Sequence, residues 1–482
     1  MEGDPDVFIH TADTPPIAPA VEFGTGALLA IAAAGIALLL VLIILFKVHA
    51  FVALLITSVA VALSAQIPAG DVFTLVGNGV GSTMGKVLII IALGAILGRL
   101  IEVSGGVQHL AESFTDRLGP RRVAVALTIV AFVVAIPVFF EVGVIVLVPI
   151  LYAFSKIAGV KPIVFGLPMF GLMLAVHVAV PPHPGVVAGA GVFGADLGLV
   201  TAISLPICAV LGLLCFWVAR IMNRTDYALA PRVAAQMAEF GQTSTVIESR
   251  RPDGTVMAPP RAGTVIGLIA LPIVQILVGT VLSLSLPADS AGRGVATFIG
   301  TPALALLVAV LVAFFVLPVR RRWGLARTNE VFESSMPPIA SILLVVAGGG
   351  VFGAVLQASG IGTALSVTLE NLGVPLLGAA FLITLALRGA QGSATVAIVT
   401  TASLLSAGVA EAGYSPLQIA AVAVAVGFGS LGLSMVTDAG FWIVTRYLGL
   451  TVADGLRTWT VLTTILGVAG FLLTWAVFAL AG

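Results

Sequence analysis

Several runs of about twenty apolar residues restrict the fold of this chain more than any other feature. A run of that length forms a helix that spans the roughly 30 Å hydrocarbon core of a bilayer. The composition agrees, since 59% of the 482 residues are hydrophobic, 9% are charged and the mean hydropathy is +1.18. We therefore predict an all-α polytopic protein of the cytoplasmic membrane, in contact with the lipid bilayer.

Composition and motifs argue against several other classes of protein. The formal net charge is zero, so no basic surface for nucleic acid is indicated. The sequence has no P-loop, no H-E-x-x-H motif and no Cys/His spacing typical of a metal site, and no nucleophile or base is spaced credibly for an enzyme. Cys208 and Cys215 fall about 10 Å apart on one predicted helix, too far for a disulfide. We expect no enzymatic activity, no cofactor and no metal.

The apolar runs divide the chain into two transmembrane halves, 26–219 and 263–482. Residues 1–25 contain no Lys or Arg and are predicted to form a flexible tail outside the cell. The polar segment 220–262 is predicted to be a cytoplasmic linker. Simple spans are expected at 26–46, 50–66, 83–102, 199–219, 263–285, 295–318, 335–356 and 458–480, with a Gly-rich segment at 71–82 leading into the third. The span at 417–434 is expected to continue past a break at 437–440.

Two segments of the first half do not fit a simple span. Residues 122–156 have basic ends and an interruption at 137–143, so each arm is about 21 Å long and too short to cross. We predict a re-entrant hairpin with Glu141 at its tip. The run after residue 162 is broken by P-P-H-P-G at 181–185, because proline lacks an amide donor, and is predicted to be a discontinuous helix.

The second half repeats the pattern of the first. G-A-I-L-G-R-L-I-E-V-S-G-G at 94–106 matches G-G-V-F-G-A-V-L-Q-A-S-G-I at 349–361, and Glu141 aligns with Thr395 after a one-residue slip. The loop after the first copy carries three arginines, whereas 358–375 has no Lys or Arg, so the copies are expected to face opposite sides of the membrane. We predict two inverted-topology repeats, each with a re-entrant hairpin and a discontinuous helix, as in many secondary transporters.

A polar stretch at 387–399 stands out within the apolar second half. A guanidinium at such a depth costs at least ~2.5 kcal/mol, so Arg388 is expected to face a cavity, a partner or an anion. It suits a substrate carboxylate because the two groups form a bidentate fork; the alternative is a lock on a local acid or on backbone carbonyls. Gln391, Ser393 and Thr395 suit substrate hydroxyls or, equally, satisfy the backbone of a broken helix.

Three residues are candidates for carrying a coupling proton. Glu141 lies in an apolar tip that disfavours its ionised form, although a permanent pair with an arginine is an alternative. His183 and Asp438 occupy the two helix breaks, and the ordinary pKa of histidine lies near neutrality. His183 and its aligned residue Thr437 are also candidates for contacting the substrate. His177 is either a site residue or a packed core histidine.

Seven motifs carry a resemblance to a known family: G-S-T-M-G at 81–85, L-G-A-I-L-G-R-L-I-E-V-S-G-G at 93–106, P-V-F-F-E-V-G at 137–143, V-P-P-H-P-G at 180–185, G-A-D-L-G at 194–198, R-G-A-Q-G-S-A-T-V-A at 388–397 and D-A-G-F-W at 438–442. They are similar to the gluconate permease (GntP) family over nearly the whole chain after residue 25. The resemblance implies the ion-transporter fold and proton-coupled uptake of gluconate or a related sugar acid.

Several features stay open at this point. A Na⁺-coupled carboxylate carrier and, less favoured, an anion channel are alternatives, and a homodimer is compatible with the sequence. Family members often carry S-H-V-N-D where this chain has S-M-V-T-D at 434–438, and a second histidine where it has Val178. These departures lie at the proposed cavity and leave open which sugar acid is carried.

Overall fold

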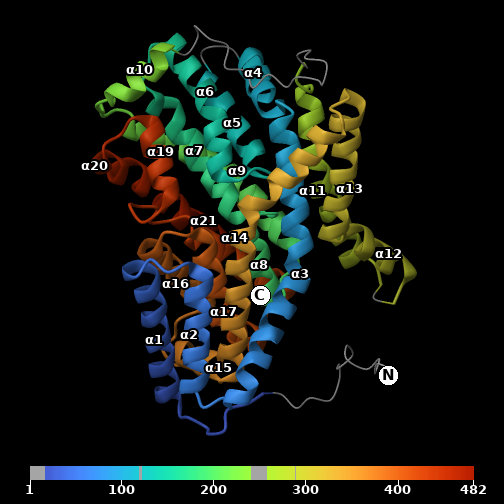
Figure 1. Cartoon of the computed structure of the whole chain (residues 1–482), viewed down its shortest axis with the longest axis vertical. Helices are drawn as coiled ribbons and strands as arrows, with labels where there is room; N and C mark the ends of the chain where they lie inside the picture. Colours follow the sequence, from blue (N-terminus) through green and yellow to red (C-terminus); the bar gives the residue numbers. More distant parts are fainter. Residues whose placement is uncertain (1–16, 119–121, 240–257, 288) are drawn as a thin grey trace.

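The computed structural model describes residues 17–118, 122–239, 258–287 and 289–482, and among these residues it contains helices and no strand (Figure 1). Residues 1–16 of the predicted tail and 240–257 of the predicted linker lie outside the described residues. The elements are α1 (Thr25–Leu40), η1 (Val41–Leu45), α2 (Ala50–Ser64), α3 (Ala69–Val103), α4 (Gly106–Leu118), α5 (Val123–Ala135), α6 (Phe140–Ala158), α7 (Pro162–Ala179), α8 (Pro184–Phe193), α9 (Leu197–Met222), α10 (Pro231–Glu239), α11 (Ala262–Ser285), α12 (Ala291–Gly300), α13 (Pro302–Phe314), η3 (Phe315–Val319), α14 (Leu325–Ala358), α15 (Ile361–Asn371), α16 (Leu376–Gln391), α17 (Ala394–Glu411), α18 (Pro416–Gly429), α19 (Ala439–Leu448), α20 (Val452–Gly455), η4 (Leu456–Thr460) and α21 (Val461–Leu480).

Ten helical stretches in the described residues are long and apolar enough to cross a membrane. Four further apolar helices are shorter, namely α2, α5, α16 and α18. Three of these short helices, α5, α16 and α18, are arms of interrupted structures. They can be short because a helix that stops inside the membrane need not have the full spanning length. The all-α polytopic fold predicted from the sequence is confirmed.

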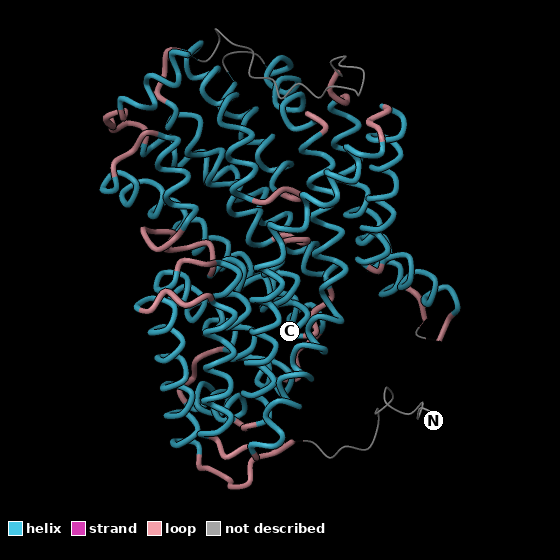
Figure 2. Tube along the Cα trace, in the orientation of Figure 1, coloured by secondary structure: helices cyan, strands magenta, loops and turns pink. Residues whose placement is uncertain are grey.

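The predicted interruptions are present in both halves. The first hairpin consists of α5 and α6 and is interrupted at 136–139; the second hairpin consists of α16 and α17 and is interrupted at 392–393. The first break, residues 180–183, separates α7 from α8, and the second break, residues 430–438, separates α18 from α19. Figure 2 shows non-helical segments midway along the molecule as well as at its ends.

The order of elements repeats. The series α3, α4, first hairpin, α7, α8 and α9 is followed later by α14, α15, second hairpin, α18, α19 and the stretch from α20 to α21. In Figure 1, α4, α5 and α6 lie toward the top, whereas α15, α16 and α17 lie toward the bottom. Corresponding elements thus lie at opposite ends of the molecule, although the sides of the membrane that they face stay a prediction, as does the division at 220–262, which contains α10.

Three predicted boundaries are wrong. The Gly-rich segment 71–82 belongs to α3, because it packs closely on α14: a Cβ added at Gly79 would lie 2.9 Å from Gly350 O. The expected single span at 295–318 is two helices that meet at Thr301, where Pro302 occupies the first turn of α13 and needs no amide partner. The span expected at 335–356 begins ten residues earlier, at Leu325, because its polar start continues the helix.

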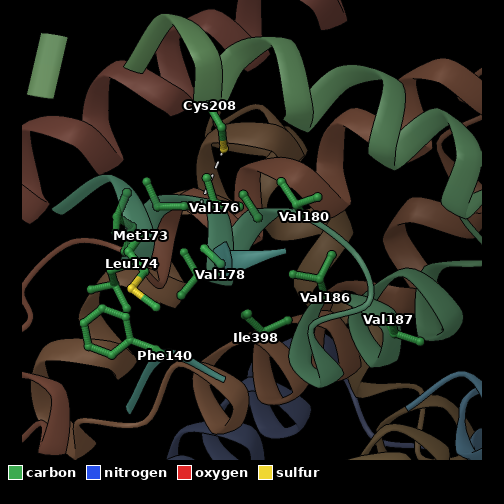
Figure 3. Packing of buried hydrophobic residues seen from close by; sticks show 14 of the residues in the cluster. Phe140, Met173, Leu174, Val176, Val178, Val180, Val186, Val187, Cys208 and Ile398 are labelled. Carbon is green, nitrogen blue, oxygen red and sulfur yellow. Dashed lines mark hydrogen bonds between the residues drawn. The ribbon is translucent and has the colours of Figure 1, made fainter. Parts of the chain in front are cut away.

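The two halves cross at their interrupted elements. The α8 helix, after the first break, packs on α17 of the second hairpin, and α19, after the second break, packs on α6 of the first hairpin. Figure 3 shows the apolar packing around the first break, where Val186 lies between Val180 and Ile398 of α17. Cys208 packs against α7 with its Sγ 3.7 Å from Ala175 O, and both cysteines are free and buried. The helix ends at the first break, residues 180–183, therefore lie inside the protein rather than against lipid.

Candidate functional site

The interruption of the second hairpin is closed by its own polar side chains. Gly392 adopts φ +82°, a left-handed conformation that glycine reaches without penalty and that ends α16. The Gln391 amide donates to Ser393 O (2.7 Å) and accepts from Ser393 N (3.1 Å), and Ser393 Oγ accepts from Val396 N (3.3 Å). Gln391 and Ser393 thus satisfy the hairpin backbone, which is one of the two roles considered for them.

Arg388 is buried at the end of α16, with 3% of its surface exposed. Nη1 donates to Gly392 O across the hairpin tip, and Nη2 donates to Asp438 Oδ2 in an ion pair. Nε has no partner among the described residues. The guanidinium therefore joins the second hairpin to the second break, and this pairing explains how a charge is tolerated at such depth.

Asp438 receives several donors at once. It caps α19, since Oδ1 accepts from Gly440 N (2.9 Å), while Oδ2 accepts from Arg388 and from Ser434 Oγ. Trp459 Nε1 in turn donates to Ser434 Oγ (2.8 Å), and Trp459 is fully buried. Sequence reasoning did not identify Ser434 or Trp459 as site residues. The signals available in the sequence were a serine four residues before Asp438 and a tryptophan within a cluster of threonines at 458–464.

Two further predicted residues line the contact between the second hairpin and its neighbours. Thr437 is exposed and its Oγ1 donates to Gly389 O (3.1 Å). A Cβ added at Gly392 would lie 2.0 Å from Thr437 O, so the hairpin tip and the second break are in direct backbone contact. Thr395 is half-buried, and its Cα would lie 3.1 Å from a Cβ at Gly185 in the first turn of α8.

The first hairpin brings aromatic rings to the two histidines. The rings of His177 and His183 lie edge to face with centroids 4.3 Å apart, and His177 also lies 6.3 Å from Phe139 and 6.2 Å from Phe140. His183 is 7% exposed and its Nδ1 has no hydrogen-bond partner among the described residues. A buried ring nitrogen without a partner is available to a bound ligand or water.

Glu141 lies in the first turn of α6, one residue after Phe140. Its side chain is exposed, and it interacts electrostatically with Asp438 and Arg388. No Lys or Arg among the described residues lies within ion-pair distance of it. The alternative of a permanent pair with an arginine is therefore absent from this conformation.

A cavity adjoins the first hairpin and the histidines. It contains about 270 Å³ of empty space, and its lining includes His177, His183, Pro182 and the hairpin residues 136–139. A second cavity of about 360 Å³ lies along the same residues 137–139 and extends toward Arg99, Glu102 and Ser334. Both halves thus contribute polar groups near interrupted helices: Glu141, His177 and His183 from the first half, Arg388 and Asp438 from the second.

The charges of this cluster do not cancel. With both carboxylates ionised and both histidines neutral, two negative charges face one positive charge, and the net charge is −1. No group of three or more His, Cys, Asp or Glu side chains in the described residues could hold a metal ion. An anion entering this cluster is repelled unless a carboxylate is neutralised or a cation enters with it.

Known proteins match this chain over nearly its whole length. The family described as "GntP family permease" matches residues 27–481. The inner membrane permease YgbN of Escherichia coli K12 is 49% identical over 452 residues, covering 94% of this chain and 98% of that protein. A gluconate permease of Pseudomonas aeruginosa is 34% identical, with 90% and 93% covered, and the Gnt-II system L-idonate transporter of E. coli K12 is 32% identical, with 92% and 97% covered.

Solved structures with a similar fold have little sequence identity to the chain. The YdaH transporter of Alcanivorax borkumensis aligns with a TM-score of 0.54 at 16% identity, covering 86% of this chain and 90% of that one. MtrF of Neisseria gonorrhoeae, described as one of a class of antimetabolite efflux pumps, aligns with a TM-score of 0.60 at 16% identity, covering 86% and 84%. These likenesses concern the fold alone.

Proposed function

Because the chain belongs to the GntP permease family, we propose that it takes up gluconate or a related sugar acid together with protons. The family and its relatives are transporters rather than enzymes, and the chain is a multi-pass protein of the cell membrane. The substrate is then a small monocarboxylate with several hydroxyl groups. Relatives named for gluconate and for L-idonate support the substrate class without selecting a member.

The net negative charge of the cluster carries the proposal for proton coupling. Glu141 and Asp438 both interact with the cation Arg388, so the substrate anion would change the net charge of this cluster from −1 to −2. Such crowding of like charge is unfavourable away from bulk water. A proton on Glu141, Asp438 or His183 compensates the charge, and binding of acid and proton then become linked.

The substrate contacts follow from the donors and acceptors at hand. Arg388 Nε and His183 Nδ1, both buried and unpartnered among the described residues, supply one donor for a carboxylate and one nitrogen for a hydroxyl. Thr437 and Thr395 add hydroxyl groups beside the hairpin tip. Gln391 and Ser393 hold the tip in shape, and substrate contact by either would require their present hydrogen bonds to open.

A Na⁺-coupled carboxylate carrier is the second candidate, since Na⁺ would compensate the same negative charge. An anion channel is less favoured, because the interrupted elements of the two halves pack on one another, α8 on α17 and α19 on α6.

Uptake into proteoliposomes tests these functions. The purified chain is reconstituted, and a panel of labelled aldonates and related hydroxy acids is offered with an inward proton gradient, an inward Na⁺ gradient or neither. We expect saturable accumulation of at least one sugar acid with the proton gradient and its loss with an uncoupler. Accumulation driven by Na⁺ alone would support the second candidate, and flux that neither saturates nor concentrates the acid would support a channel.

A further inference from the structure

The carboxylate of Asp438 occupies the position on Arg388 that a substrate carboxylate would need. Arg388 Nη2 is bound to Asp438 and Nη1 to the hairpin carbonyl of Gly392, so each terminal nitrogen of the guanidinium already holds an acceptor. Only Nε is unpartnered among the described residues. A substrate carboxylate bound beside the ionised Asp438 would place two negative charges on one buried guanidinium, so it competes with Asp438 for Arg388.

Protonation of Asp438 is a direct way to release Arg388. The ionised carboxylate accepts from Arg388, Ser434 and Gly440, and a proton removes the charge that makes the contact with Arg388 favourable. The buried guanidinium then lacks a counterion, which favours entry of a new carboxylate. The net charge near Arg388 is the same before and after the exchange.

Ser434 and Trp459 hold the carboxylate in this arrangement. Ser434 Oγ donates to Asp438 Oδ2, and Trp459 Nε1 donates to Ser434 Oγ at 2.8 Å, which leaves the serine hydrogen for Asp438. Both side chains are fully buried. Trp459 also stacks on Phe140 of the first hairpin, with ring centroids 6.0 Å apart, so the same tryptophan contacts the tip that carries Glu141.

We propose that the substrate carboxylate binds Arg388 in place of Asp438 when Asp438 takes up a proton, and that Ser434 and Trp459 are the positioning residues that set how readily it does so. This inference rests on the proposed function and selects Asp438 among its three proton candidates. It implies one proton for each monocarboxylate bound at Arg388, and no net charge moved by that exchange alone.

Other titratable groups lie near Asp438. Glu141 interacts with it electrostatically but makes no ion pair with Arg388, and His177 and His183 interact electrostatically with Arg388. None of these three can release the guanidinium by titrating, because none is bonded to it among the described contacts. The remaining described groups on elements packed against α19 are Tyr152, Lys156, Arg232, Asp454 and Arg457.

Equilibrium binding of labelled gluconate to the purified protein, measured from about pH 5 to pH 8, tests the inference. For the wild type we expect the dissociation constant to rise about tenfold for each pH unit above a midpoint, the slope of one linked proton. Asp438→Asn mimics the protonated side chain, so its binding should be independent of pH. Exchange of gluconate should persist in this variant, while accumulation driven by a proton gradient is lost.

Ser434→Ala and Trp459→Phe keep the inference testable if Asp438→Asn does not fold. Loss of the serine donor makes the ionised carboxylate less favourable, so proton uptake and gluconate binding should extend to higher pH, with the midpoint moved up by about one pH unit. Trp459→Phe should move it in the same direction by about half as much, because it acts through Ser434. Ser430→Ala and Trp475→Phe are matched controls, because the Ser430 hydroxyl donates to Gly427 O and the Trp475 side chain is exposed on α21.

The outcomes separate the inference from the function on which it rests. Wild-type pH dependence in Asp438→Asn, or unchanged midpoints in both Ser434→Ala and Trp459→Phe, would overturn the inference while leaving a sugar-acid carrier intact. Absence of binding and uptake for every acid in the panel would contradict the proposed function itself.

Discussion

Replacing Gly392 with alanine tests whether the second hairpin must touch the second break. Gly392 has φ +82°, and an added Cβ would lie 2.0 Å from Thr437 O, whereas real Cβ contacts are essentially never under 3.0 Å. The tip and the break must therefore separate by at least about 1 Å. A charge-assisted hydrogen bond of about 2.8 Å does not survive that displacement, so Arg388 would lose Asp438.

Gly413→Ala is the matched control. Gly413 also has a left-handed backbone, with φ +65°, but an added Cβ meets nothing within 4 Å. Both variants bear the backbone cost of alanine in this conformation, about 1 kcal/mol. Only Gly392→Ala also breaks a buried ion pair, which costs about 3–5 kcal/mol.

We expect the free energy of unfolding of Gly392→Ala, from denaturant titration in detergent, to be about 3 kcal/mol below that of Gly413→Ala. This difference is the lower end of the range of about 3–5 kcal/mol for breaking a buried ion pair, because the hairpin tip can relax. Although Asp438 then no longer competes for Arg388, the guanidinium moves with the tip away from Thr437, which is also proposed to contact the substrate. The dissociation constant for gluconate should therefore rise at least about tenfold, or 1.4 kcal/mol, in Gly392→Ala and stay near wild type in Gly413→Ala. Equal stability and equal affinity in the two variants would refute the contact between tip and break as the support of the site.

Three further predictions concern charge and topology. Arg388→Lys keeps a positive charge but loses the planar fork, so the free energy of binding of the acid should weaken by ~1.5–3 kcal/mol. The affinity for the neutral lactone, measured by competition, should stay at the wild-type value. If the ratio of acid affinity to lactone affinity equals that of the wild type, Arg388 does not bind the carboxylate. Glu141→Gln should still accumulate gluconate if Asp438 carries the proton, whereas exchange without accumulation would assign the proton to Glu141. Single cysteines at the exposed positions 226 and 325 should be protected from an impermeant external thiol reagent, while one at 372 should react; the opposite pattern would contradict the inverted repeats.

Much of the fold could be predicted because the membrane imposes simple rules on length and continuity. Apolar runs gave α1, α2, α9 and α11 within a few residues, and prolines located the first break. The start of α3 was missed because glycine suggests a loop when helix propensity is read alone. Its actual role is to let α3 approach α14, as the contact of Gly79 with Gly350 shows, and that role depends on a partner more than 270 residues away.

The prediction of a single span at 295–318 was wrong because hydropathy does not show where one helix ends and the next begins. The sequence is apolar on both sides of Thr301, so hydropathy alone gives one span. Pro302 is compatible with a helix at its first turn, and it therefore marks the start of a new helix as readily as a kink in an old one. Only the packing of α11 against α12 and α13 decides between these readings.

The site was predicted as a set of residues but not as a set of bonds. Arg388 and Asp438 could each be recognised because an ionisable group inside a membrane segment requires a reason. Their ion pair could not be predicted, since they are fifty positions apart in the sequence. Glu141 was also expected near the middle of the membrane and was an equally acceptable partner for Arg388. Trp459 was not predicted as a site residue, because a tryptophan near the start of a span ordinarily lies at the membrane interface. In the structure it is fully buried and donates to Ser434. These bonds decide the proposed mechanism, because a guanidinium paired with Asp438 puts the substrate anion in competition with that carboxylate, and this competition is what would link the proton to the substrate.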